Sequence, residues 1–209
     1  MEDKTISESE SLAIITEMID RTKCRLHIGD GNMLLLWGYT SLAVTLLTFI
    51  THAITHHQAS NWLWFLIWII GGSVSAHICR KHESNKAVRT YTDLISSRLW
   101  TLVGYCAIFI TAVCLALMLF GGKDCWIAML IFGLLIVGIA IAVQGFIIRE
   151  KSLVTGGSVG IAAGIIVMCC SLGRIAVAAS WGYPLIATSF LLMLVIPGHI
   201  LNRKARRQC

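Results

Sequence analysis

Three histidines lie close together in the segment FITHAITHHQASNWLWF, which spans residues 49–65. On a helix, His52 and His56 would be one turn apart on the same face, which is a usable spacing for two metal ligands. His57 would point about 100° away from that face. The segment also falls where one strongly apolar run stops and the next begins. We therefore expect a hydrated turn between two membrane helices, and a metal site built from His52, His56 and His57 is the alternative.

Three further polar residues lie in or near long apolar runs. His77 and His199 are each within about a turn of a basic cluster, and Gln144 lies deeper in its run. Such groups inside a membrane either mark a functional site or bond to a neighbouring helix, because lipid offers no hydrogen-bond partner. We expect Gln144 to bond across to another helix, with a substrate contact as the alternative. His77 and His199 either share a functional role or form hydrogen bonds at the membrane boundary.

Several reactive motifs are absent from the sequence. No Asp, Glu, Lys or Arg falls in the middle of an apolar run, where proton pumps and ion-coupled carriers usually keep one. The chain has no HExxH motif, Gly-rich phosphate loop or serine elbow, and its eight cysteines form no CxxC. We expect the cysteines to act as small hydrophobic residues, with a disulfide among Cys125, Cys169 and Cys170 as the alternative. The sequence thus predicts no catalytic residue and no cofactor.

The composition places the chain in the membrane class. Hydrophobic residues make up 56% of the 209 residues and charged residues only 13%, against about 25% charged residues in soluble domains. An apolar run of roughly 20 residues is long enough to cross a bilayer as a helix. Six such runs predict an all-α bundle of six transmembrane helices, at residues 33–55, 61–79, 99–120, 125–148, 153–172 and 184–201. Residues 173–183 either form a turn or extend one of the neighbouring helices.

The basic residues predict how these spans are oriented. All but two of the 17 Lys and Arg residues fall on one side of the six spans, the exceptions being Lys123 and Arg174. Cytoplasmic segments of multi-pass proteins carry such an excess of positive charge. We therefore expect both termini in the cytoplasm of a bacterial cell, with residues 202–209 as a basic cytosolic tail.

Residues 1–32 are expected to form a cytosolic amphipathic helix and a turn. Leu12, Ile15 and Ile19 share one helical face, and GDGN at residues 29–32 predicts a turn in which Asn32 caps the next helix. Acidic residues far outnumber Lys4 within residues 1–20, so anionic lipid would repel this segment. We expect it to pack on the chain's own basic residues, and a cytosolic protein partner is the alternative. A second amphipathic stripe precedes the third span, at Val88, Tyr91, Ile95 and Leu99.

Two patterns concern the relation between helices. HICRK at residues 77–81, FIIREK at residues 146–151 and HILNRK at residues 199–204 end alternate spans. They indicate either three repeated hairpins or the features that inward-ending helices share. Small residues at Gly156, Gly160 and Gly164 form GxxxGxxxG, which is typical of close helix packing. We expect internal packing there, and a homo-oligomer formed through this face is the alternative.

The acidic segment ISESESLAIITEMI at residues 6–19, the WGY at residues 37–39 and the IPGHIL at residues 196–201 carry a resemblance. With this arrangement the chain resembles a group of small, uncharacterised bacterial inner-membrane proteins that have six helices. The resemblance covers most of the chain. It implies a multi-pass membrane protein and carries over no catalytic residue.

The sequence favours a non-enzymatic protein that binds, regulates or acts as a scaffold within the membrane. A small-solute transporter or channel is the second interpretation, and a metal or redox enzyme is the third. The expected partners are the lipid bilayer, a second copy of the chain or a cytosolic protein. Nucleic acid is not expected, because the basic residues form short clusters at the ends of apolar runs.

Overall fold

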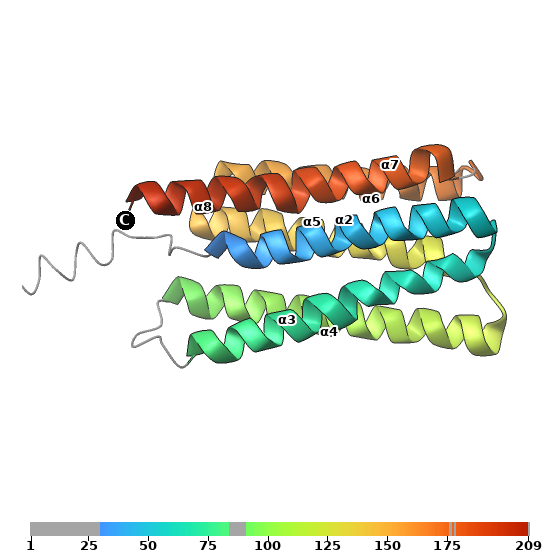
Figure 1. Cartoon of the computed structure of the whole chain (residues 1–209), viewed down its shortest axis with the longest axis horizontal. Coiled ribbons are helices and arrows are strands. Elements are labelled where there is room, and N and C mark those ends of the chain that lie inside the picture. The colour runs from blue at the N-terminus through green and yellow to red at the C-terminus, as the bar shows by residue number, and fades with distance from the viewer. Residues whose placement is uncertain (1–29, 84–90, 176, 178, 209) are drawn as a thin grey trace, which may run out of the picture.

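The computed structural model describes residues 30–83, 91–175, 177 and 179–208, and no strand occurs among them. The predicted amphipathic helix at the N-terminus, and Val88 of the second stripe, lie outside these residues. Long helices run side by side along the longest axis of the molecule (Figure 1). They are α2 (Asp30–Thr55), the 3₁₀-helix η1 (Gln58–Trp64), α3 (Phe65–Glu83), α4 (Tyr91–Gly121), α5 (Trp126–Ile148), α6 (Lys151–Leu172), α7 (Ala179–Phe190), the π-helical turn η2 (Leu191–Val195) and α8 (Ile196–Gln208).

Six helical segments are long and apolar enough to cross a membrane. They are Gly31–Thr55, Gln58–Ile78, Leu94–Gly121, Trp126–Ile148, Lys151–Leu172 and Trp181–Arg207. The last of them runs without a break through α7, η2 and α8. The predicted all-α class and the predicted number of apolar spans are confirmed for the described part of the chain, whose helices are those of a multi-pass membrane protein.

Three helix starts differ from those predicted. Helix α4 begins at Tyr91 rather than Leu99, because the amphipathic residues before the third span continue the same helix. Helix α7 begins at Ala179 rather than Pro184, so this proline lies inside the helix. Asn32 is not a cap but the third residue of α2, where its side-chain oxygen accepts a hydrogen bond from Asn202 Nδ2 at 2.7 Å. The Asn32 side chain, which was predicted to cap the helix, therefore bonds to α8 instead.

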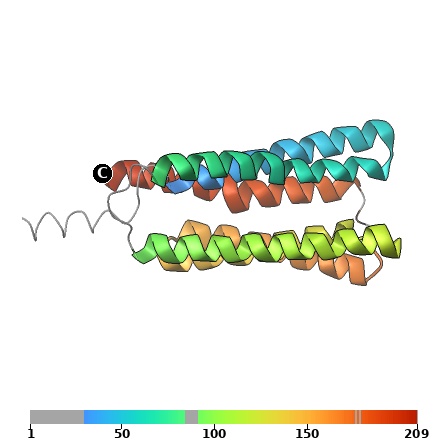
Figure 2. The same cartoon turned by 90° about the horizontal axis from the view of Figure 1, so that it is seen from below.

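The spans are arranged in two layers (Figure 2). One layer contains α2, α3 and the last span, and the other contains α4, α5 and α6. Among the described residues the layers meet mainly where α6 lies against α7, η2 and α8. The α2–α3 pair and the α4–α5 pair thus each stay within a layer, whereas α6 and the last span are divided between layers. The three hairpins differ in their surroundings, and a threefold repeat stays a prediction.

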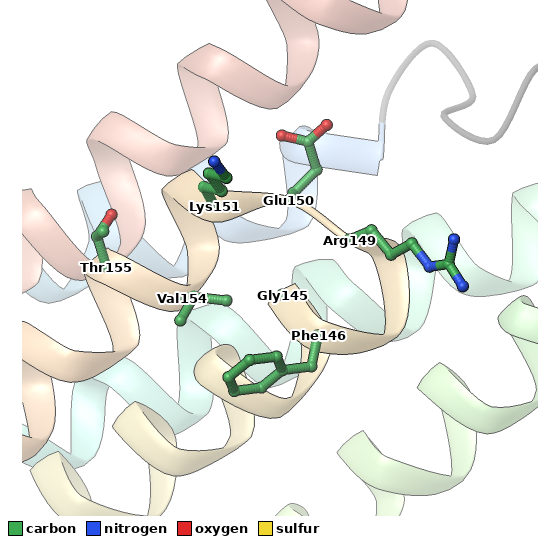
Figure 3. Close-up of a pocket in the computed structure, with 7 residues that line it drawn as sticks. All are labelled: Gly145, Phe146, Arg149, Glu150, Lys151, Val154 and Thr155. Atoms are coloured by element: carbon green, nitrogen blue, oxygen red, sulfur yellow. The ribbon is translucent and has the colours of Figure 1, made fainter.

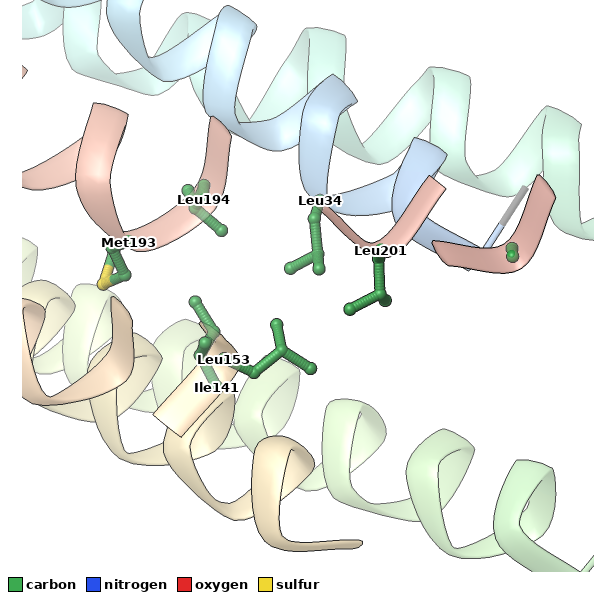
Figure 4. Packing of buried hydrophobic residues seen from close by; sticks show 7 residues of the cluster. Leu34, Ile141, Leu153, Met193, Leu194 and Leu201 are labelled. Carbon is green, nitrogen blue, oxygen red and sulfur yellow. The ribbon is translucent and has the colours of Figure 1, made fainter. Parts of the chain in front are cut away.

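A buried apolar cluster joins the two layers (Figure 4). Its members come from five helical segments and are Leu34, Ile141, Leu153, Met193, Leu194, Leu201 and Ala205. Ile141 and Leu153 are completely buried and point toward Leu34 and Leu201 of the other layer. Lipid tails are as apolar as these side chains, so close van der Waals contact rather than escape from water must stabilise this junction.

Glycine lets the backbones of α5 and α6 touch. A Cβ atom at Gly157 would lie 2.5 Å from the amide nitrogen of Ala142 and 2.6 Å from the carbonyl oxygen of Gly138. A Cβ atom at Gly138 would lie 2.8 Å from the amide nitrogen of Ile161. Real Cβ atoms do not approach other atoms so closely, so both positions require glycine for this packing.

The GxxxGxxxG face of α6 is filled by helices of the same chain. Gly156 and Gly160 lie against η2, where their missing side chains would meet Met193 and its neighbours. Gly164 lies against Leu135 of α5. These contacts agree with internal packing at the three glycines, and a homo-oligomer formed through this face stays a prediction.

The π-helical turn of the last span ends at Val195, two residues before Pro197. Proline has no backbone N–H, and its ring collides with the carbonyl four residues earlier in an α-helix, here that of Met193. A wider π turn accommodates this conflict. A Cβ atom at Gly156 would lie 3.0 Å from the carbonyl oxygen of Leu192 and 3.1 Å from that of Met193. The turn therefore brings backbone against backbone where α6 meets the last span.

Candidate functional site

The end of α3, the start of α4, the α5–α6 turn and the end of α8 lie at the end of the molecule that holds the C-terminus, which we call the basic end (Figure 1). The exposed basic residues there come from α3, α4, the α5–α6 turn and α8, and are Arg80, Arg98, Arg149, Lys151, Arg203, Lys204, Arg206 and Arg207. Lys123 and Arg174 are exposed at the opposite end. The molecule is therefore strongly polarised along its long axis.

A pocket of about 400 Å³ opens at the basic end, where α5 stops and α6 starts (Figure 3). Its lining consists of Gly145, Phe146, Arg149, Glu150, Lys151, Val154 and Thr155. Arg149 ends α5 in the left-handed conformation, with φ 60° and ψ 39°, and its amide donates to the carbonyls of Gly145 and Phe146. Few residues other than glycine adopt this conformation. It reverses the chain tightly enough to place basic side chains next to the end of the apolar span.

An ion pair holds the acidic residue of the pocket. Lys204 Nζ of α8 lies 2.6 Å from Oε2 of Glu150, whose side chain is only 12% exposed. Lys204 is about half exposed, so the pair itself contributes about 0–1 kcal/mol to stability. Its larger effect is on local charge. Glu150 is neutralised by a lysine from another helix, which leaves Arg149 and Lys151 as the uncompensated charges of the pocket.

Polar pairs join α2 to α8 near the basic end. The hydroxyl of Tyr39 lies 2.7 Å from His199 Nε2. One turn closer to the basic end, Asn202 Oδ1 accepts a hydrogen bond from the amide of Gly31 at 3.1 Å. His77 is exposed on α3. Among the described residues no hydrogen bond brings His77 and His199 together, and His199 joins two helices instead.

Two further hydrogen bonds join neighbouring helices within each layer. Gln144 Nε2 of α5 donates to Ser96 Oγ of α4 at 2.9 Å. Trp37 Nε1 of α2 donates to Ser75 Oγ of α3 at 3.0 Å. Interhelical bonds of this kind contribute about 0.6 kcal/mol each in membranes. Gln144 Oε1 is buried without a partner among the described residues. Most serine and threonine hydroxyls in these spans instead donate to a backbone carbonyl of their own helix, as Thr45 and Thr48 do.

The three clustered histidines have different surroundings at the opposite end. The ring of His52 packs beside that of Tyr183, with centroids 6.0 Å apart. His56 is exposed and leaves the helix with φ 52°. His57 caps η1, since its Nδ1 accepts the amide N–H of Ala59 at 3.1 Å. In the described part of the chain, no three His, Cys, Asp or Glu residues form a group suited to a metal ion.

We expect the purified protein to hold no stoichiometric zinc or copper. His57 already uses Nδ1 to cap η1, and His56 turns away from the helix that would place it above His52. Metal content measured by inductively coupled plasma mass spectrometry checks this. If His52→Ala and His56→Ala each removed a metal found in the wild type, the histidines would form a site after all.

Sequence reasoning missed the pocket and the pair between Tyr39 and His199. Arg149 and Lys151 appear in the sequence within the FIIREK motif and the overall charge asymmetry, but neither pattern indicates a pocket at the turn between α5 and α6. Among the described residues, the free thiols are Cys106, Cys114, Cys125, Cys169 and Cys170. No disulfide therefore constrains the described residues.

No protein-family model, no curated protein and no solved structure matches this chain. The function is therefore argued from the contacts and charges of the chain itself.

Proposed function

We propose that this chain is a non-enzymatic scaffold of the bacterial inner membrane, and that its basic end binds acidic segments of cytosolic proteins. The observation that carries the proposal is the gathering of exposed basic side chains from four parts of the chain at one end. The polar side chains within the spans support the non-enzymatic part of the proposal. Hydrogen bonds between helices pair Tyr39 with His199 and Gln144 with Ser96, which suits a structural role.

The same charge asymmetry supports an orientation with the basic end in the cytoplasm. Basic segments are retained on the cytoplasmic side during membrane insertion, whereas acidic residues have little effect. In that orientation both termini are cytoplasmic. Arg203, Arg206 and Arg207 of α8 then project into the cytosol within little more than one helical turn.

The charge of α8 selects the class of partner. Arg203, Arg206 and Arg207 are exposed, and Arg206 and Arg207 lie in the last turn of the helix. Unpaired helix carbonyls make that turn favourable for cations, so its positive charge is stable. Arginine binds carboxylates with two parallel hydrogen bonds, which suits an acidic peptide segment. The acidic residues 1–20 of the chain itself have the same chemistry and would compete with an external partner.

Neutralising the end of α8 is expected to weaken the binding of an acidic peptide. The full chain is placed in nanodiscs of neutral phosphatidylcholine, and fluorescence anisotropy measures its affinity for a labelled polyglutamate peptide. Arg206→Gln with Arg207→Gln should reduce the affinity by up to about thirtyfold at low salt, since each of the two exposed charge pairs contributes about 0–1 kcal/mol. Added salt should reduce the wild-type affinity as well.

The matched control replaces the two basic residues of the opposite end. Lys123→Gln with Arg174→Gln removes the same charge from exposed positions and should leave peptide affinity unchanged. Equal weakening by both pairs would show that net charge rather than the basic end attracts the peptide. Either that result or undetectable binding by the wild type at low salt would overturn the proposal.

A further inference from the structure

We propose that the pocket at the α5–α6 turn is a binding site for one anionic glycerophospholipid. The phosphate of the lipid lies between Arg149 and Lys151, and an acyl chain follows the exposed face of α5. This site is separate from the α8 surface described above and uses different residues. It requires the chain to lie in a membrane but does not depend on which side the basic end faces.

The level of the pocket along the spans is that of lipid headgroups. The apolar segment Trp126–Ile148 ends one residue before Arg149, and the next segment begins at Lys151. Both cations therefore lie where the hydrocarbon core gives way to the charged surface of the bilayer. The phosphate of a lipid lies at the same depth in the bilayer, so it can reach these cations without leaving its normal position.

The charge of the pocket matches a phosphate. Lys204 binds the carboxylate of Glu150 at 2.6 Å, so the acidic residue in the lining does not repel an anion at full strength. Figure 3 shows Arg149 and Lys151 leaving the turn on different sides, with the carboxylate of Glu150 turned away from Phe146. Arginine binds phosphate oxygens in a fork, and lysine adds a point charge. Both side chains are long and exposed, so they contact one phosphate by turning toward it from the two sides of the chain reversal.

The apolar part of the pocket continues into an exposed strip on α5. Phe146 lines the pocket and is 69% exposed. Val143 and Ile139 follow at one and two turns' distance, and they are 37% and 51% exposed. Residues spaced in this way share one helical face. The strip leads from the headgroup level toward the middle of the span, which is the path of an acyl chain. A free anion would gain nothing from it.

The test measures lipid binding to the purified full chain by native mass spectrometry after delipidation. Phosphatidylglycerol should bind more tightly than phosphatidylcholine with the same acyl chains. Arg149→Asn with Lys151→Gln should weaken phosphatidylglycerol binding by about twenty-five-fold, since each basic residue near a lipid surface contributes about fivefold. Asparagine is chosen at position 149 because it tolerates the left-handed conformation better than most residues. Circular dichroism and gel filtration check that the variant is folded.

Matched variants separate the pocket from general charge. Arg206→Gln with Arg207→Gln removes the same charge from the basic end and should change phosphatidylglycerol binding less than twofold. Phe146→Ala keeps both cations and should weaken long-chain phosphatidylglycerol about fivefold or more, by loss of a large side chain from the acyl path. That variant also keeps the proposal testable if the charge variant misfolds.

Three results would overturn the lipid site. Equal affinity for phosphatidylglycerol and phosphatidylcholine would show that Arg149 and Lys151 do not select an anionic headgroup. Equal losses in the Arg149/Lys151 and Arg206/Arg207 variants would place the lipid elsewhere on the basic end. Displacement of the lipid by glycerol 3-phosphate at similar concentration would identify a site for free phosphate compounds. Failure of polyglutamate binding alone would overturn only the α8 proposal, because that assay contains neutral lipid.

Discussion

Gly157→Ala is expected to destabilise the protein by about 1–3 kcal/mol, the usual cost of adding atoms to a closely packed interior. The added Cβ would lie 2.5 Å from a backbone nitrogen of Ala142 and 2.6 Å from the carbonyl oxygen of Gly138. Neither atom can move without separating α5 from α6. Thermal unfolding in detergent, followed by tryptophan fluorescence, should show a midpoint lower by about 2–4 °C for each kcal/mol.

Gly133→Ala is the matched control on α5. A Cβ atom at Gly133 would meet nothing within 4 Å, and the residue is exposed. Alanine there should stabilise the protein by about 0.5–1 kcal/mol, because glycine loses more backbone entropy in a helix. The same chemical change thus has opposite signs at two positions. If Gly157→Ala raised the unfolding midpoint as Gly133→Ala does, the α5 and α6 backbones could not be in contact.

A membrane-impermeant maleimide is expected to label Cys125 from outside intact cells and a cysteine at position 207 only after permeabilisation. Cys125 precedes α5 at the end opposite to the basic end and is partly exposed. Position 207 is exposed in the last turn of α8. The contrast should be nearly complete, because the reagent does not cross the bilayer. One variant keeps Cys125 alone, and the other carries Arg207→Cys as its single cysteine.

The reverse labelling pattern would place the basic end outside the cell. The α8 surface would then face the wrong compartment for a cytosolic partner, and the proposed scaffold function would fail. The lipid site would not fail with it, since anionic lipid binding in detergent does not depend on orientation. Labelling of both positions without permeabilisation would instead indicate that the cells had leaked, and a periplasmic and a cytoplasmic marker protein control for this.

The two proposals divide the basic end between two sets of residues. Arg206 and Arg207 lie on α8 and serve the acidic peptide, whereas Arg149 and Lys151 lie on the α5–α6 turn and serve the lipid. Each pair of substitutions is therefore the charge-matched control for the other. Lys204 belongs to neither pair because its bond to Glu150 joins α8 to the turn. Changing it would alter both surfaces together.

The sequence by itself determined the helical class, the number of apolar spans and the uneven distribution of charge. These properties depend on the local chain, because every backbone group inside a bilayer must be bonded within its own helix. A run of about 20 apolar residues is therefore sufficient to predict a span. The ends of a helix were harder to predict, because α4 begins at Tyr91 and α7 at Ala179, before the apolar runs that they contain. Polar residues flanking a span can extend the helix into the headgroup layer without cost to the backbone.

Only the tertiary structure decided which helices touch and which side chains meet. Tyr39 bonds His199 and Glu150 binds Lys204 across many residues of sequence, and the GxxxGxxxG face meets η2 and α5 of the same chain. Lipid surrounds every span, so hydrophobicity does not favour one helix pair over another. The choice rests on the fit of small side chains to particular backbones, as at Gly138 and Gly157, and on a few polar bonds. Such fits involve residues from separate helices, and no single stretch of sequence contains them.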